Sequence, residues 1–320
     1  MNNLTHKGIV LVPSDFEGVN WVEKLAAANL NTLGMHSGGG AAHDVRKELK
    51  FMRDAAFRKQ LAEQGLDYEY EIHCSHDLID HALAETHPEY FPADYRRREV
   101  ITDGNWCVSN PEALKLVVEN ALLLARDLPS STHRYFFWGV DRLQRAWCHC
   151  PKCAHLSAAD QVLITANAIA ERITEVDPQG MVCYLAYQTS LELPRHVKPH
   201  ERVFMEFAPY FRCYHHAFTD NNCAVNVSNR EAFEKMLTLF APERTHILEY
   251  WLDSSLYGFT QHPPLKPIFV PELVESDIRY YCSLGIKSIT TFAVRQDGEY
   301  MQAHGDREFQ TYAEILNKYL

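Results

Sequence analysis

The run RYFFWGVD (Arg134–Asp141) and the segments that follow it decide the fold class. This run is apolar and aromatic, which is typical of a buried strand, and it ends in a carboxylate. Ser157, with Asp160 three residues later, forms a capping-box pattern at the start of the helical segment AADQVLITANAIAERITEV. The apolar run MVCYLAY (Met181–Tyr187) predicts the next strand. A strand, a helix and a second strand in this order predict a parallel β-α-β unit.

The same alternation extends in both directions from this unit. Further strand-like runs occupy residues 8–14, 31–37, 68–75, 202–209, 246–254 and 288–295. Eight strands, seven of them followed by a helical pattern, in 320 residues predict an α/β fold, a (β/α)₈ TIM barrel. We expect a single domain over residues 1–320, with a long loop after strand three and a cysteine-rich loop after strand four. The competing fold, a doubly wound open sheet, lacks its fingerprint, because HSGGGAAH does not have the G-x-G-x-x-G spacing.

Composition narrows the classes of partner. The formal charge of −11 at pH 7 argues against nucleic acid and anionic membranes. The first residues, MNNLTHKGIVLVPSDFEG, lack the apolar core of a signal peptide, and no apolar stretch approaches the length of a membrane span. Nine cysteines, an odd number without an export signal, indicate reduced thiols. We therefore expect a cytoplasmic protein, and the oligomeric state stays open, a homo-oligomer included.

In a barrel of this type, the carboxyl ends of the strands carry the chemistry. Asp141 and Glu249 end strands four and seven, and they are the predicted catalytic pair. Because Asp141 ends an apolar strand, we expect it to be partly desolvated, which suits a general acid. The residues predicted to contact the substrate lie at or just beyond the other strand ends: His36, His73, His76, Trp138, Tyr187, Glu206, Tyr210, Arg212, Trp251, Asp253 and Arg295.

Carboxylates, aromatic side chains and histidines without a phosphate cradle are typical of a carbohydrate site. Aromatic faces stack on sugars, and two carboxylates about 5–5.5 Å apart, or more in inverting enzymes, cleave a glycosidic bond. If the sugar carries a 2-acetamido group, that group can act as the nucleophile, with Asp141 orienting it. Two other functions stay open: a non-catalytic sugar-binding barrel, and a hydrolase with a metal held by His36, His73 and His76. A structural role for each of these side chains also stays open.

The segment WCHCPKC (Trp147–Cys153) concentrates three cysteines in six positions. The C-P-K-C part is similar to half of a zinc knuckle, in which thiolates hold Zn²⁺. Cys148, Cys150 and Cys153 would need a fourth ligand, for which we choose Cys213 from a later segment that also contains His215, His216 and Cys223. The alternatives are a packed cluster of buried thiols and a disulfide. Nothing in the sequence indicates a cofactor for catalysis.

Several of these segments together resemble a known bacterial family, domain of unknown function 4838, part of which is classified as glycoside hydrolase family 163. The resemblance is carried by YFPADYRRREVITDGNWCVSNPEAL, VDRLQRAWCHCPKC, YLAYQTSLELPRHVKPHERV and RCYHHAFTDNNCAVN, between about residues 73 and 226. Asp141 falls on the family's strand-four aspartate, and five cysteines fall on family cysteines: Cys148, Cys150, Cys153, Cys213 and Cys223.

The resemblance implies a TIM-type barrel and a β-linked oligosaccharide substrate, because characterised members are endo-β-N-acetylglucosaminidases that release N-glycans. The chain departs from the family in the apolar tripeptide Trp138-Gly139-Val140 before Asp141, where a polar tripeptide is usual. That departure leaves room for a different sugar specificity.

Overall fold

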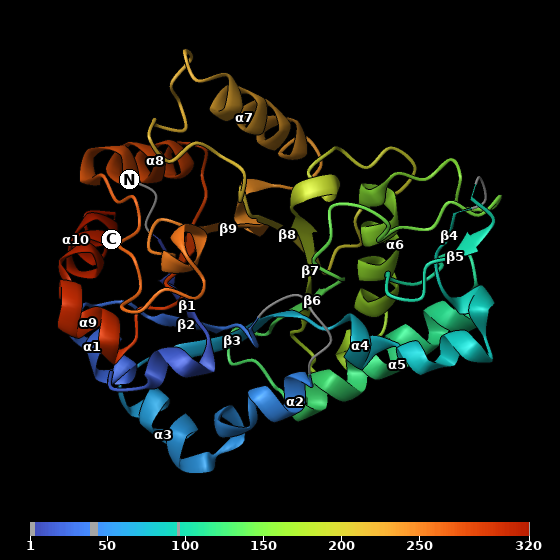
Figure 1. The fold of residues 1–320 in the computed structure, drawn as a ribbon, viewed down its shortest axis with the longest axis horizontal. Helices are drawn as coiled ribbons and strands as arrows, with labels where there is room; N and C mark the ends of the chain where they lie inside the picture. Colours follow the sequence, from blue (N-terminus) through green and yellow to red (C-terminus); the bar gives the residue numbers. More distant parts are fainter. Residues whose placement is uncertain (1–3, 39–43, 95–96, 320) are drawn as a thin grey trace. The chain divides into compact units, whose positions relative to one another are not determined.

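The computed structural model describes residues 4–38, 44–94 and 97–319 (Figure 1). Eight parallel strands form a closed barrel in the order β1-β10-β9-β8-β7-β6-β3-β2, with helices between them along the chain. These strands are β1 (His6–Leu11), β2 (Thr32–Met35), β3 (Asp67–His73), β6 (Arg134–Trp138), β7 (Met181–Ala186), β8 (Val203–Phe207), β9 (Thr245–Glu249) and β10 (Ser288–Phe292). The predicted (β/α)₈ class is therefore confirmed, and the open sheet is excluded.

The chain divides into two compact units, and each is described by itself. The first unit contains Met1–His36, Asp54–Glu69 and Glu206–Leu320, and the second contains Ser37–Arg53 and Tyr70–Met205. Because a barrel can contain two such units, the single domain over residues 1–320 stays a prediction.

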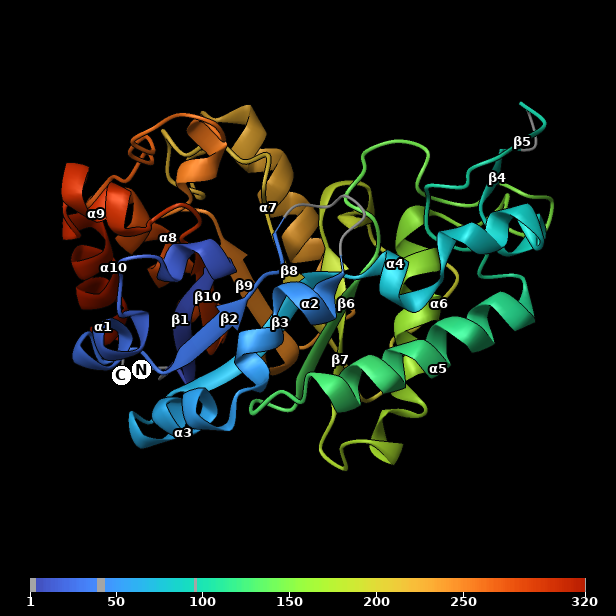
Figure 2. The same cartoon turned by 60° about the horizontal axis from the view of Figure 1, so that its bottom comes forward.

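In the first unit, β1 pairs in parallel with both β2 and β10, and β10 pairs with β9. Figure 2 shows β1, β2 and β10 side by side. The helices of this unit are α1 (Trp21–Ala27), α3 (Ala55–Glu63), α7 (Ala224–Met236), α8 (Pro271–Ser283), α9 (Gly298–His304) and α10 (Arg307–Asn317). Strand β1 ends before Pro13, earlier than predicted, because Pro13 begins a short 3₁₀ turn.

In the second unit, β6 pairs in parallel with β3 and with β7. Helix α6 (Ala158–Ala170) lies beside β7, as Figure 1 shows, and the unit also contains α2 (Val45–Glu48), α4 (Ser75–Leu78) and α5 (Pro111–Asp127). The predicted capping box is confirmed, because Ser157 and Asp160 form it at the start of α6. Asn110 likewise caps α5 by accepting hydrogen bonds at its start. The long loop after β3 contains a small antiparallel pair, β4 (Ala93–Asp94) with β5 (Glu99–Val100).

Helix α7 shows where local pattern failed. Ser228 and Glu231 have the spacing of a capping box, but α7 begins at Ala224, so both residues lie inside the helix. A polar residue three positions before a glutamate is also ordinary in an exposed helical turn, which makes the pattern weak without a preceding breaker.

Within the described ranges, no helix combines the length and the apolar character needed to span a bilayer.

Candidate functional site

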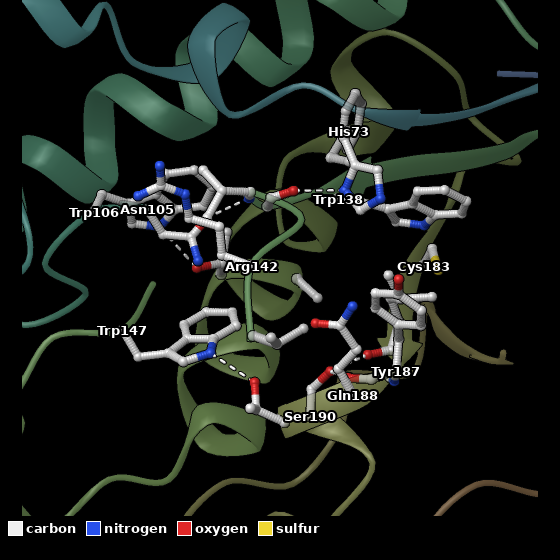
Figure 3. A pocket seen from close by; sticks show the side chains of 18 of the residues that line it. His73, Asn105, Trp106, Trp138, Arg142, Trp147, Cys183, Tyr187, Gln188 and Ser190 are labelled. Carbon is white, nitrogen blue, oxygen red and sulfur yellow. Dashed lines mark hydrogen bonds between the residues drawn. The ribbon is translucent and has the colours of Figure 1, made fainter. Parts of the chain in front are cut away.

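A cavity in the second unit lies between β6, β7 and helix α6 and extends to the loops that follow the two strands (Figure 3). Its wall is rich in aromatic side chains: Trp106, Trp138, Trp147 and Tyr187. In Figure 3, Trp147 lies on one side of the cavity and Tyr187 with Gln188 on the other. A concave, largely apolar recess with a few polar groups is typical of a site for a small molecule.

Asp141 lies at the rim of this cavity, three residues after the end of β6. Its Oδ1 accepts hydrogen bonds from the Tyr187 hydroxyl and from the Gln188 side-chain amide, both at 3.1 Å. Both donors also line the cavity, so the carboxylate and the recess share one wall. The expected desolvation is wrong, because Asp141 is exposed to solvent.

The peptide just before Asp141 is held from two sides. The Gly139 carbonyl lies 2.7 Å from His73 Nδ1, and the Val140 amide donates to Asn105 Oδ1 at 2.8 Å. Any side chain at position 139 would place its Cβ 2.3 Å from that same Asn105 oxygen. Glycine is therefore required here by a close approach, and the backbone that carries Asp141 is fixed before any ligand binds.

Three predicted substrate contacts lie together at this cavity: His73, Trp138 and Tyr187. The His73 ring lies 5.0 Å from the Trp138 ring and 6.4 Å from the Tyr187 ring, measured between centroids. His76 does not join them. It stacks on His81 at 3.7 Å, and burial lowers the pKa of His81 to about 4, so His81 is neutral at pH 7.

Sequence reasoning missed two of the tryptophans. Trp147 donates through Nε1 to Thr189 at 2.9 Å, and the buried Trp106 donates to Thr165 at 3.0 Å, which fixes both rings in the wall. A signal was present, because each tryptophan stands immediately before a cysteine, in Trp106-Cys107 and in Trp147-Cys148. Nothing in the sequence alone showed that these two cysteines lie together.

In the first unit, the predicted catalytic Glu249 is fully buried. Its Oε1 accepts from Arg212 and from the Tyr281 hydroxyl of α8, both at 2.7 Å, and Arg212 also pairs with Asp277 of α8 at 2.7 Å. Burial raises the pKa of Glu249 and of Asp277. Burial by itself would lower the pKa of Arg212, but the two carboxylates reverse the shift, so the guanidinium stays charged.

This environment does not fit the roles predicted for Glu249 and Arg212. An acid/base catalyst must reach its substrate, whereas Glu249 is turned to α8 with no exposed surface. Trp251, two residues along, has the same orientation, since its ring lies 6.0 Å from that of Tyr312 on α10. Alternation along the strand explains both cases: residues two apart share a face, and here that face contacts the helices.

Asp253 and Arg295 hold loops of the first unit. Asp253 is nearly buried and caps the short helix Ser254–Tyr257 by accepting from Ser255, and burial raises the pKa of Asp253 to about 6. Arg295 donates to the carbonyls of Gly258 and Gln261 at 2.7 and 2.6 Å. Both side chains are therefore engaged with the segment that follows β9, which differs from the substrate contact predicted for them.

The remaining predicted contacts of this unit are mostly enclosed. Glu206 has no exposed surface and lies 3.8 Å from His246, and the buried His36 packs edge-on against Phe292. Tyr210 is half-buried against Tyr250. None of the metal-capable side-chain groups found within residues 4–38, 44–94 and 97–319 includes His36, His73 or His76, so the proposed histidine-held metal finds no support.

The cysteines form a cluster whose membership differs from the prediction. Cys148, Cys150 and Cys153 lie with Cys107, and their sulfur atoms are all within 4.8 Å of one another. The predicted fourth member, Cys213, instead lies with His216 and Cys223 in the first unit. None of the nine cysteines, all of which lie within the described residues, forms a disulfide, so the disulfide alternative finds no support.

Solved structures with a similar fold are glycosidases. A β-N-acetylhexosaminidase from Bacteroides fragilis has a TM-score of 0.58 at 13% identity over 98% of this chain and 66% of its own. A chitinase from Rhizomucor miehei has a TM-score of 0.58 at 8% identity over 99% and 100%. A maltogenic α-amylase from Thermotoga neapolitana has a TM-score of 0.51 at 12% identity over 100% and 77%. At these identities the likeness establishes the fold alone.

No curated protein matches the sequence closely enough to count as a relative. A family model does match, and it covers residues 20–315, which include Asp141, Glu249 and the four clustered cysteines. The chain therefore belongs to the family described as Domain of unknown function (DUF4838).

Proposed function

We propose that this protein is a glycosidase that cleaves a β-linked oligosaccharide containing an N-acetylhexosamine, with Asp141 at the reacting centre. The observation that carries the proposal is the exposed Asp141 carboxylate, held by Tyr187 and Gln188 at the rim of a cavity lined with aromatic rings. The similar fold of a β-N-acetylhexosaminidase and of a chitinase supports the choice of sugar. Family membership supports it further.

The geometry favours a mechanism in which the substrate supplies the nucleophile. The acetamido oxygen attacks the anomeric carbon, the glycosidic C–O bond breaks, and a cyclic oxazolinium forms. The leaving oxygen takes its proton from a water molecule. A second water then adds its hydroxyl to the anomeric carbon, the bond between that carbon and the acetamido oxygen breaks to restore the acetamido group, and the remaining proton neutralises the hydroxide left by the first water. Asp141 would hold the acetamido N–H and stabilise the positive charge that develops on the ring. Two neutral donors keep this carboxylate in place without neutralising its charge.

The aromatic wall would serve substrate orientation. The Trp147 ring is half-buried and fixed by its bond to Thr189, so one face can stack on a sugar ring without loss of side-chain freedom. Trp138 and His73 close the recess near Gly139. This arrangement can discriminate between sugars by their shape, and the charged contact of the sugar with Asp141 is confined to the rim.

The test compares the wild type with Asp141→Asn on paired aryl β-N-acetylglucosaminide and aryl β-glucoside substrates. We expect the wild type to prefer the acetamido sugar, and Asp141→Asn to lose about 10²–10³-fold in kcat/KM, equivalent to about 3–4 kcal/mol of transition-state stabilisation. Asp80→Asn is the matched control. Asp80 is also exposed in the second unit, and asparagine can replace it as the cap that accepts from Ala82.

Full activity in Asp141→Asn would remove Asp141 from the reaction. Equal activity of the wild type on both substrates would remove the acetamido group from it. A thiazoline analogue of the oxazolinium should inhibit the wild type more strongly than the free sugar does, because a mimic of the transition state binds more tightly than substrate.

One observation favours the second candidate, a non-catalytic sugar-binding barrel. The predicted partner carboxylate, Glu249, is enclosed by Arg212 and Tyr281 instead of facing solvent. A binding protein would quench or shift the Trp147 fluorescence on adding chitooligosaccharide, and would release no reducing sugar over long incubation. Turnover above that of the heat-treated protein excludes this candidate.

A further inference from the structure

We infer that Cys107, Cys148, Cys150 and Cys153 form a structural zinc site that holds two tryptophan-bearing loops of the cavity wall in place. The four residues come from two segments of the second unit, the loop before α5 and the loop between β6 and α6. Three of the four are buried and Cys150 is half-buried. The chemical class of the ligand follows from the donors, because four protein thiolates around a closed tetrahedral site are typical of structural Zn²⁺.

The spacing of the sulfur atoms fits a tetrahedral ion. Zn–S bonds of about 2.3 Å place the corners of a regular tetrahedron about 3.8 Å apart. Cys107 Sγ lies 3.8 Å from Cys150 Sγ and 3.8 Å from Cys153 Sγ. A disulfide requires about 2.05 Å, so these distances are too long for a covalent bond between sulfurs.

Hydrogen-bond donors lie close to the clustered sulfur atoms. The Ser109 hydroxyl lies 2.9 Å from Cys153 Sγ, and backbone N–H groups of Ala93 and Cys150 hydrogen-bond to the Cys148 thiol. Donors of this kind stabilise thiolate sulfur around a bound ion.

The backbone around the cluster is also organised. The Cys153 amide donates to the Cys150 carbonyl at 2.9 Å, which closes the tight Cys-Pro-Lys-Cys turn. The Gln161 side chain of α6 binds both the amide and the carbonyl of Cys148, at 3.0 and 3.1 Å. The turn and the clamp set the direction of the thiols before an ion arrives.

The position of the site gives it a consequence. Trp106 precedes Cys107 and Trp147 precedes Cys148, so an ion bound by these two cysteines would fix two walls of the cavity through adjacent residues. Asn105 belongs to the same loop as Cys107, and it binds the Val140 amide next to Asp141. The zinc would be structural, because all four of its ligands are protein side chains and no coordination position is left for a substrate.

The test is the metal content of the full chain, purified without chelators and measured by mass spectrometry, and it needs no activity. We expect one zinc per chain to be lost in Cys148→Ser. Cys282→Ser, which replaces a buried thiol of α8 in the first unit, should keep the metal content of the wild type. Equal zinc in the wild type and in Cys148→Ser, no zinc in the wild type, or iron in place of zinc would each overturn the assignment.

A second measurement covers the case in which Cys148→Ser does not fold. The wild type, produced with Co²⁺ in place of Zn²⁺, should show the intense visible absorption and the near-ultraviolet charge-transfer bands of tetrahedral cobalt thiolate. A spectrum of octahedral cobalt, or none, would overturn the site even without the variant. Chelation of the zinc protein should lower its Tm, since an ion that binds only the folded state stabilises it.

Discussion

The two carboxylates predicted as a catalytic pair occupy opposite environments. Glu249 has no exposed surface and shares Arg212 with a second acid, Asp277, whereas Asp141 is exposed and accepts from two neutral donors. Both were predicted to end barrel strands, so their places in the sequence pattern did not distinguish them. The structure distinguishes the two carboxylates. Glu249 lies on the face of β9 that contacts α8, whereas Asp141 lies beyond β6 in a loop. A strand-end carboxylate becomes a catalytic candidate only when it faces away from the helices.

The largest expected effect is a loss of stability when the buried environment of Glu249 is disturbed. Arg212→Met should lower the free energy of unfolding by about 3–5 kcal/mol, because Glu249 and Asp277 would remain buried without their cation. Urea unfolding followed by circular dichroism measures it. Arg279→Met is the control, since Arg279 is exposed on the same helix as Asp277. A loss below about 1 kcal/mol would mean that the cluster is open to water and that Glu249 is not confined to a structural role.

The next effect concerns pH. The pKa of Asp253 is raised by burial from 3.8 to about 6, so the folded state binds the proton more tightly than the unfolded chain. Its contribution to stability is present below about pH 4 and is lost as the pH rises to about 6, at about 1.4 kcal/mol for each pH unit. Asp253→Asn should remove this part of the pH dependence.

The comparison is the difference between the unfolding free energies of Asp253→Asn and of the wild type, followed from pH 4 to pH 7. Identical slopes for wild type and Asp253→Asn would contradict the burial of this carboxyl group.

The smallest effect tests the other side of the comparison. Tyr187→Phe removes one of the two donors to Asp141 and should reduce kcat/KM by about fivefold, about 1 kcal/mol, with the unfolding free energy nearly unchanged. The double variant with Asp141→Asn is the control. If Tyr187 acts through Asp141, the second substitution adds little to the first. Full additivity would indicate that Tyr187 contacts the sugar independently.

The fold was predictable from the sequence because its signals are local and repeated. Apolar strand runs, the Asn110 and Ser157 caps and the regular alternation of strands and helices each indicate the same barrel. The cavity was predictable in part: His73, Trp138 and Tyr187 all come from strands or strand ends. A residue that follows a strand directly inherits its place from the barrel.

The other features of the site, namely the cysteine cluster, the two missed tryptophans and the burial of Glu249, depend on contacts between residues distant in the sequence. Cys107 and Trp106 lie in a long loop, so no periodicity indicated that they would meet Cys148 and Trp147. Cys213 was chosen as the fourth ligand from residue type alone, and the structure places it elsewhere. Glu249 and Trp251 were predicted to face the substrate. The alternation of side chains along a strand places the two residues on the same face, but it does not tell which face points to the helices.

The close contact at Gly139 has a consequence for affinity. His73 and Asn105 hold the peptide that leads to Asp141 from both sides, so the chain is ordered there when the protein folds. When a ligand binds at the rim, the backbone that leads to Asp141 has already lost its conformational entropy during folding. Less of the interaction energy of the ligand is therefore needed to order the site. The affinity for a ligand at this rim should therefore depend little on the motion of this loop. In a site that a closing lid completes, affinity depends strongly on such motion.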